Sequence, residues 1–215
     1  MPAGLRMAED TVNVSAKRLL LAEYQALLGW LSSGVAHEIN NSLGQIYLLA
    51  GMPGHADALE RVRGIGERIA SYAEVLVTLS RPAVEQRPDA DLAVELKAAR
   101  ELVERTGRLR NCRIVDNCVK SAPTSKDGFV LRALATIAMI YAAAQQDLSG
   151  AMRVGLVEDG DDWVLSLAGS TPPEKKFSNV PDLKDTLALA CRCAHAEIES
   201  TQVSSARGLR IRVPR

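Results

Sequence analysis

One histidine stands out among the residues of this chain that could do chemistry. His37 lies within residues 29–43, a stretch with a helical pattern, and Asn41 follows it by one turn. At about 100° per residue, His37 lies roughly opposite the centre of an apolar stripe, which consists of Leu28, Leu31, Val35, Ile39, Leu43 and Ile46. Neutral imidazole is a good nucleophile near pH 7 and can carry a phosphoryl group. The adjacent Glu38 could orient the ring or take a proton from it.

The simpler alternative is that His37 is only one polar residue on the exposed face of an amphipathic helix. Gly34, one turn earlier on the same side, costs about 1 kcal/mol against alanine inside a helix. That cost favours the close approach of a partner protein beside the histidine. We therefore predict a docking patch that includes Trp30, Leu31 and Gly34.

Composition narrows the range of functions. The 215 residues suit one or two domains, and 47% of them are hydrophobic. The 26 basic residues balance the 26 acidic ones, which argues against a nucleic-acid surface as the main function. No apolar run approaches the roughly 20 residues of a membrane span, and no signal peptide is visible. We expect a cytoplasmic protein without a membrane partner, and the 4 cysteines fit a reduced compartment.

Two long helices are predicted for the first part of the chain. A flexible tail, residues 1–14, precedes a helix over residues 15–50, and the glycines and proline of residues 51–57 end that helix. A second helix follows over residues 56–80. Helices joined by such a short turn pack antiparallel. Their apolar stripes would be better covered in a homodimer, as a four-helix bundle, so residues 15–82 form the predicted dimerisation domain.

The composition changes after a linker at residues 81–88, and residues 83–215 form the second predicted domain. An α+β sandwich is expected there, with helices on one face of a mixed sheet. The predicted helices are residues 92–105, 129–146 and 182–195, and the predicted strands are residues 113–116, 151–156, 163–167, 196–199 and 209–213.

The literal string around the histidine resembles the H-box of sensor histidine kinases. It reads Ala36-His37-Glu38-Ile39-Asn40-Asn41-x-Leu43, where the family has A-H-E-I-N-N-P-L. The resemblance implies that His37 accepts a phosphoryl group on the first helix of a dimeric hairpin. It also implies that Glu38 assists transfer and that Asn41 supports dephosphorylation of a partner. Ser42 stands where the family usually has proline, so the proline kink of that helix is not assured here.

The second half resembles the ATP-binding domain of the same family in its order of elements, most clearly over residues 187–214. The residues that hold nucleotide in that family are missing, however. Residues 131–142 contain no asparagine to hold magnesium, and residues 167–173 keep one glycine but lack the adenine-reading aspartate. The second glycine motif is replaced over residues 184–189. A triphosphate needs magnesium ligands and backbone donors brought close by glycine, so we expect no ATP site and no bound cofactor.

Together these features resemble the dimeric, kinase-like histidine phosphotransferases of multistep phosphorelays. The resulting hypothesis is that His37 shuttles a phosphoryl group between aspartates of receiver domains, in response regulators or hybrid kinases, and that Mg²⁺ comes with the receiver. Three alternatives stay open: a non-catalytic scaffold that binds a receiver, an active kinase with an unusual nucleotide site, and a phosphatase that uses Asn41. Cys191, Cys193 and His195 do not predict a zinc site, because they do not share one helix face.

Overall fold

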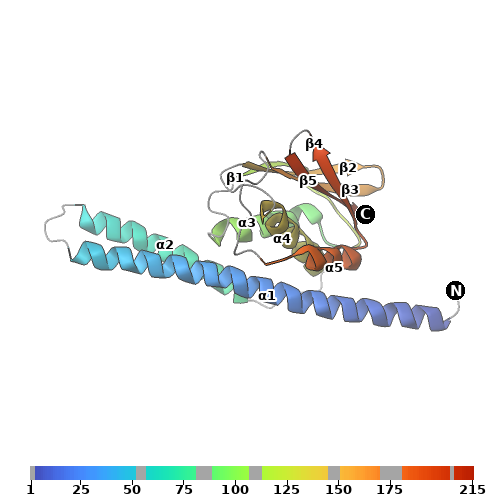
Figure 1. Ribbon diagram of the computed structural model, residues 1–215, viewed down its shortest axis with the longest axis horizontal. Helices are drawn as coiled ribbons and strands as arrows, with labels where there is room; N and C mark the ends of the chain where they lie inside the picture. Colours follow the sequence, from blue (N-terminus) through green and yellow to red (C-terminus); the bar gives the residue numbers. More distant parts are fainter. Residues whose placement is uncertain are drawn as a thin grey trace.

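The computed structural model describes residues 3–51, 57–80, 89–106, 113–144, 151–169, 181–203 and 206–215. The chain forms a helical hairpin followed by an α/β sandwich (Figure 1). Its helices are α1 (Ala3–Ala50), α2 (Ala58–Ser80), α3 (Leu92–Arg105), α4 (Gly128–Ala144) and α5 (Lys184–Ala194). Its strands are β1 (Arg113–Cys118), β2 (Ala151–Asp159), β3 (Asp162–Gly169), β4 (Glu197–Val203) and β5 (Ala206–Pro214). The predicted fold class is confirmed.

The hairpin differs from the prediction at its start. Helix α1 begins at Ala3, so the predicted start at residue 15 is wrong. Helix α2 agrees with the prediction within two residues. At 1.5 Å per residue the 48 residues of α1 span roughly 72 Å. The helix continues without a break through Ser42, which is buried, so the chain shows no kink where the kinase family has proline. The predicted linker, residues 81–88, lies outside the described residues.

The sheet has five strands in the order β1-β2-β3-β5-β4. Strand β1 pairs parallel to β2, and the other neighbours pair antiparallel. The β2–β3 connection is a two-residue turn, Gly160-Asp161, and Gly160 takes a φ of 66° that favours glycine. Both strands are therefore longer than predicted.

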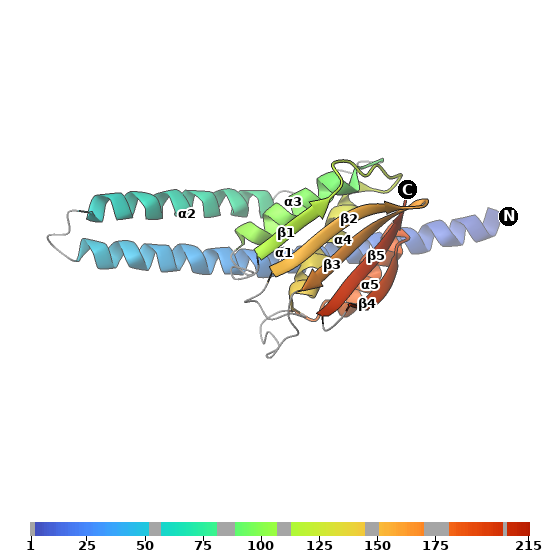
Figure 2. The same ribbon diagram turned by 90° about the horizontal axis from the view of Figure 1, so that it is seen from above.

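Three layers stack on one another (Figure 2). The sheet forms one outer layer, helices α3, α4 and α5 form the middle layer, and the N-terminal part of α1 lies against α4 and α5 from the far side. Helix α4 is consequently buried on nearly every side, as its alanine-rich apolar sequence predicts. Buried residues of α1, including Leu20, Tyr24 and Leu27, belong to the same core as those of α4 and the sheet.

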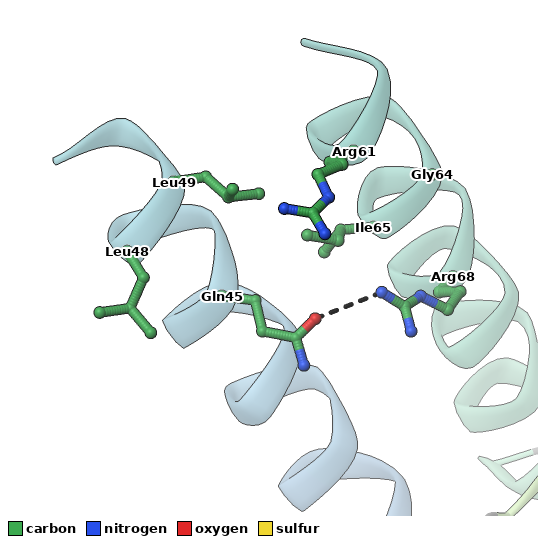
Figure 3. Close-up of a pocket in the computed structure, with 7 residues that line it drawn as sticks. All are labelled: Gln45, Leu48, Leu49, Arg61, Gly64, Ile65 and Arg68. Atoms are coloured by element: carbon green, nitrogen blue, oxygen red, sulfur yellow. Dashed lines mark hydrogen bonds between the residues drawn. The ribbon is translucent and has the colours of Figure 1, made fainter. Parts of the chain in front are cut away.

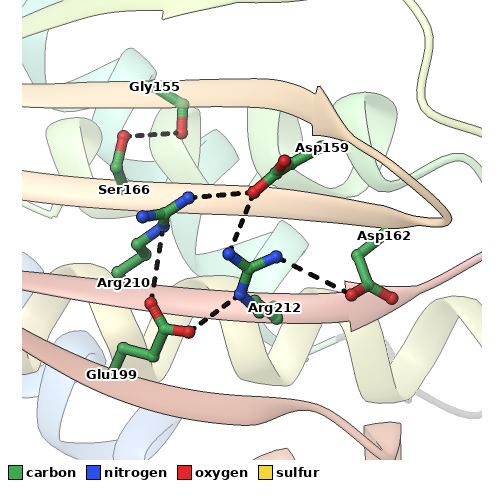
Figure 4. Close-up of polar contacts among 7 residues, drawn as sticks. All are labelled: Gly155, Asp159, Asp162, Ser166, Glu199, Arg210 and Arg212. Carbon is green, nitrogen blue, oxygen red and sulfur yellow. Dashed lines mark hydrogen bonds and ion pairs between the residues drawn. The ribbon is translucent and has the colours of Figure 1, made fainter.

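Charged side chains cover part of the sheet face that points away from the helices (Figure 4). Arg212 pairs with Glu199 at 2.8 Å and with Asp159 at 2.9 Å, and Arg210 pairs with Asp159 at 3.1 Å. These pairs join three strands, and each of the side chains is at least partly exposed. Salt bridges at such positions typically contribute less than about 1 kcal/mol each, so the network sets strand register and solubility more than stability.

Helix α3 is fixed at its first turn by Asp91. The Asp91 carboxylate accepts hydrogen bonds from the backbone N–H groups of Ala93 and Val94, which caps the helix. It also accepts hydrogen bonds from the Ser121 hydroxyl and the Ala122 N–H group, which ties the segment after β1 to the helix. Burial raises the pKa of Asp91, but these four hydrogen bonds outweigh it and leave that pKa below its ordinary value.

Candidate functional site: an exposed histidine on the hairpin

The hairpin presents His37 to solvent. Helix α2 and the α/β domain both pack on the side of α1 that carries Leu31 and Val35, each 0% exposed. His37 is exposed, about 120° around the helix from Leu31. Asn41 is exposed on the same side, one turn further on, while Glu38 is half-buried. The structure thus brings His37 and Asn41 to one open face and places Glu38 at its border.

The predicted docking patch is only partly at the surface. Trp30 is half-buried, and it lies within about 20° of His37 around the helix. Gly34 and Leu31 are buried. Leu31 has no exposed surface to offer a partner, so its predicted role in docking is wrong. The apolar spacing that placed it in the patch serves the contact of α1 with the rest of the chain instead.

The residues of the predicted apolar stripe of α1 also differ in burial, because the stripe winds around the helix axis. Leu28, Ile39 and Ile46 are half-buried, whereas Leu43 is 41% exposed. Ser42, which was not assigned to the stripe, is buried at 5% exposure. The stripe therefore faces the interior of the chain around Leu31 and Val35 and leaves apolar surface open nearer the hairpin tip.

A groove opens between α1 and α2 beyond the histidine (Figure 3). This hairpin groove has a volume of about 580 Å³ and is lined by Gln45, Leu48, Leu49, Arg61, Gly64, Ile65 and Arg68. Arg68 donates a hydrogen bond to the Gln45 side chain at 3.3 Å across the groove. Figure 3 shows the guanidinium group of Arg61 between the helices, near Leu49 and Ile65. Sequence reasoning missed the groove, although Leu48 follows His37 by three turns on the same face.

The second structural feature of the site is the contact between α1 and α4. The Tyr24 and Thr136 hydroxyls share a hydrogen bond of 3.4 Å, and the ring of Tyr24 meets Phe129 edge to face with centroids 5.8 Å apart. Lys17 pairs with Asp127 at 3.5 Å, just before α4 begins. Desolvation raises the pKa of Tyr24, which keeps its hydroxyl protonated. The outer face of α4 is therefore filled by side chains of α1.

An ion pair between a buried carboxylate and a partly exposed arginine joins α4 to α3. Arg132 on α4 donates a hydrogen bond to the Glu95 carboxylate on α3 at 2.7 Å, and Glu95 is 3% exposed. Thr136 donates to the backbone oxygen of Arg132 at 2.8 Å. Helices α1, α3 and α4 thus share one polar cluster, and the loss of Arg132 would leave the buried Glu95 carboxylate without this partner.

The described residues support neither a metal site nor a membrane-spanning helix. No group of three or more histidine, cysteine, aspartate or glutamate side chains could hold a metal ion in the part of the chain that the structure describes. Within the same part, no helix is both long enough and apolar enough to cross a membrane. His55 and Cys112 lie outside the described residues.

Comparisons with known proteins show which structures this chain is similar to. No protein-family model matches the sequence, and no curated protein matches it. Solved structures do match. A bacterial phosphotransferase solved at 1.7 Å superposes with a TM-score of 0.53 and 14% identity, over 86% of this chain and 95% of its own. The chain therefore shares the fold of this phosphotransferase.

Histidine kinases themselves also match. AdeS of Acinetobacter baumannii has a TM-score of 0.48 and 11% identity, over 83% of this chain and 97% of its own. A histidine kinase of Burkholderia phymatum has a TM-score of 0.48 and 12% identity, over 87% and 97%. At these identities the likeness concerns the fold alone.

Proposed function

We propose that this protein is a histidine phosphotransferase of a two-component phosphorelay. His37 would receive a phosphoryl group from the aspartate of one receiver domain and pass it to another, without ATP. One observation carries the proposal: α1 leaves His37 exposed on one side while its N-terminal half covers the outer face of α4. By the resemblance in sequence, α4 is the helix that would hold magnesium through an asparagine in a kinase, and it has none.

The chemistry needs few groups from this chain. A lone pair on one ring nitrogen of neutral His37 attacks the phosphorus of an aspartyl phosphate. A P–N bond forms as the P–O bond breaks, and the electron pair leaves on the carboxylate of the receiver. The ring is then positively charged, with its proton on the other nitrogen, and Glu38 is near enough in sequence to stabilise that charge or to take the proton. Both phosphorylated forms are high in energy, so the transfer runs in either direction.

We propose that the protein acts as a homodimer. Both helices of the hairpin carry apolar or small side chains on a face that α1 and α2 do not cover in each other. On α1 this face includes Leu43 and Tyr47, which are 41% and 79% exposed. On α2 it forms an outer stripe at helical spacing, which consists of Leu59, Val62, Gly66, Ala70, Ala73 and Val77. Leu43 and Tyr47 lie about 120° and 80° around the helix from His37, so a second copy packed there leaves the histidine open.

A transfer assay tests the function. Receiver domains from the same organism, phosphorylated with labelled acetyl phosphate, are incubated with the protein. We expect acid-labile label on the wild-type chain and none on His37→Ala, while Asn40→Ala, a neighbouring exposed residue, serves as the matched control. Label that persists in His37→Ala would remove this residue from the role. Receiver binding without any label on the chain would instead favour a scaffold.

A nucleotide titration addresses the kinase alternative. Calorimetry with Mg²⁺ and ATP should give no heat of binding at millimolar nucleotide, because Tyr24 of α1 packs against α4, whose sequence has no asparagine to hold magnesium. Saturable binding, or incorporation of the γ-phosphate of ATP into His37, would contradict the proposal.

A further inference from the structure

The hairpin groove has the size and the lining of a small-molecule site. Its volume of about 580 Å³ is within the range of such pockets, roughly 300–1,000 Å³. Leu48, Leu49 and Ile65 supply apolar lining, and two arginines stand along the α2 wall (Figure 3). Sites for small organic ligands combine a mainly apolar lining with a few charged or polar groups that fix the orientation of the ligand.

The two arginines of the groove differ in their surroundings. Arg68 donates a hydrogen bond to the Gln45 side chain, and this bond spans the groove at the end nearer His37. Arg61 lies two turns closer to the hairpin tip, with its guanidinium group between the helices near Leu49. In the part of the chain that the structure describes, no carboxylate pairs with Arg61. A guanidinium group beside apolar side chains is well suited to a ligand carboxylate, because it is weakly hydrated and presents paired N–H donors.

Gly64 leaves the wall open between these two arginines. Glycine destabilises the interior of a helix relative to alanine. A Cβ atom at Gly64 would meet no side chain, and no backbone of another element, within 4 Å. The packing of the chain therefore does not require glycine at this position. Because Gly64 lines the groove, its missing side chain leaves room for a bound molecule next to Ile65.

The groove stays accessible in the proposed homodimer. The outer stripe of α2, which is the proposed dimer contact of that helix, lies roughly 100–180° around the helix from Arg61. On α1, the dimer contact Leu43 lies about 140° around the helix from Leu48. A second copy packed on these faces covers neither wall of the groove.

We propose that the hairpin groove is a binding site for a medium-chain fatty acid. The carboxylate of the fatty acid pairs with Arg61, and its aliphatic chain lies against Leu49 and Ile65. The chain follows the groove for the two helical turns, roughly 10 Å, that separate Arg61 from Arg68. The site is distinct from the reacting atoms of the proposed transfer, because Leu48 is roughly 16 Å from His37 along the axis of α1.

Calorimetry on the full chain, with decanoate below its micelle concentration, tests this assignment. Decanol removes the charge of the ligand, and octanoate and hexanoate shorten its chain. Arg61→Gln removes the guanidinium group, and Gly64→Leu places a side chain in the groove without a change of charge. Arg63→Gln is the matched control, because Arg63 lies about 160° around the helix from Arg61 and pairs with Glu67 in solvent. Circular dichroism checks that each variant is folded.

We expect saturable binding of decanoate, with an affinity that falls about two- to fourfold for each methylene removed. The affinity should fall about fivefold in Arg61→Gln, and decanol should bind to wild type about fivefold less tightly than decanoate does. Gly64→Leu should abolish binding, and Arg63→Gln should stay within about twofold of wild type. The absence of saturable binding, equal effects of the two arginine substitutions, or unchanged binding in Gly64→Leu would overturn the assignment.

His37→Ala separates this site from the proposed function. The groove does not include His37, so His37→Ala should bind decanoate as tightly as wild type does, and a loss of binding in this variant would contradict the assignment. If decanoate binds but no receiver transfers label to the chain, the fatty-acid site is upheld and the transfer function fails. If label reaches His37 but decanoate does not bind, the transfer function stands and the fatty-acid site fails.

Discussion

Tyr24 shows at the scale of a residue how the two halves of the chain are joined. Its ring is 2% exposed, packs against Phe129, and brings its hydroxyl to Thr136 in α4. Tyr24→Phe keeps the ring and loses one hydrogen bond, which should lower the free energy of unfolding by about 1 kcal/mol. Tyr24→Ala opens a cavity and should lower it by about 3–5 kcal/mol. Urea denaturation measures both.

Tyr47 provides the control for this pair of substitutions. It is on the same helix and is 79% exposed. Tyr47→Phe should change the free energy of unfolding by less than about 0.5 kcal/mol. Equal effects of the phenylalanine substitutions at the two positions would show that the contact between Tyr24 and α4 does not stabilise the fold.

A buried cysteine thiol should make the stability of the folded chain fall at alkaline pH. Burial raises the pKa of Cys191 to about 12, from 9.0 in an exposed thiol. The unfolded chain therefore loses the thiol proton at lower pH than the folded chain does. Stability is full below about pH 9 and falls as the pH rises from there towards 12. Cys191→Ala should flatten this fall in urea midpoints between pH 8.5 and 10.5, and an unchanged slope would contradict the assignment.

At the scale of an element, helix α3 depends on its first turn. Asp91 caps it and holds the segment at Ser121 and Ala122. Asp91→Ala should lower the free energy of unfolding by about 1–2 kcal/mol. Because the folded chain holds the pKa of Asp91 below 3.8, its contribution is present above that pH and is lost as the pH falls further. Thermal melts at pH 7 and pH 3 should show the smaller difference between Asp91→Ala and wild type at pH 3.

The helices and strands with clear periodicity were predictable from the sequence. Their ends were predictable only where the sequence carries a local signal for them. Both ends of the 92–105 helix were predicted to the residue, because the linker ends shortly before it and a regular apolar spacing defines it. The start of α1 was not, since residues 3–13 carry no regular apolar pattern and yet continue the helix. The strands predicted over residues 151–156 and 163–167 were too short, because both continue through acidic residues until two residues remain for the turn.

The candidate site was predictable only in part. The position of His37 opposite an apolar stripe was enough to predict its exposure, and the string around it gave the resemblance. Leu31 and Leu59 could not be placed by spacing alone. Leu31 is fully buried in the core of the chain, and Leu59 is 83% exposed although it belongs to an apolar repeat. Which of two apolar faces of a helix is covered depends on partners that are distant in sequence or in another chain.

At the scale of the whole molecule, the outer stripe of α2 leads to a prediction about assembly. Wild type should elute and scatter light as a dimer, with about twice the 23.2 kDa of the chain. Ala73→Glu combined with Val77→Glu places two charges in the outer stripe and should give a folded monomer, because buried unpaired charges are costly. The matched control is Val94→Glu on α3, where a valine that is 56% exposed lies outside the hairpin. A monomeric wild type would contradict the proposed dimer.

The packing of α1 against α4 also bears on how such a chain could change over evolution. If an asparagine were introduced into α4 and glycines into the segments after β3 and before α5, Tyr24 would still contact α4, and Leu20 and Leu27 would still be buried in the shared core. Removal of these buried side chains would destabilise the packing of the helix that carries His37. For the proposed carrier, a gain of kinase activity would demand several simultaneous substitutions, and each single one would cost stability before any new activity rewards it.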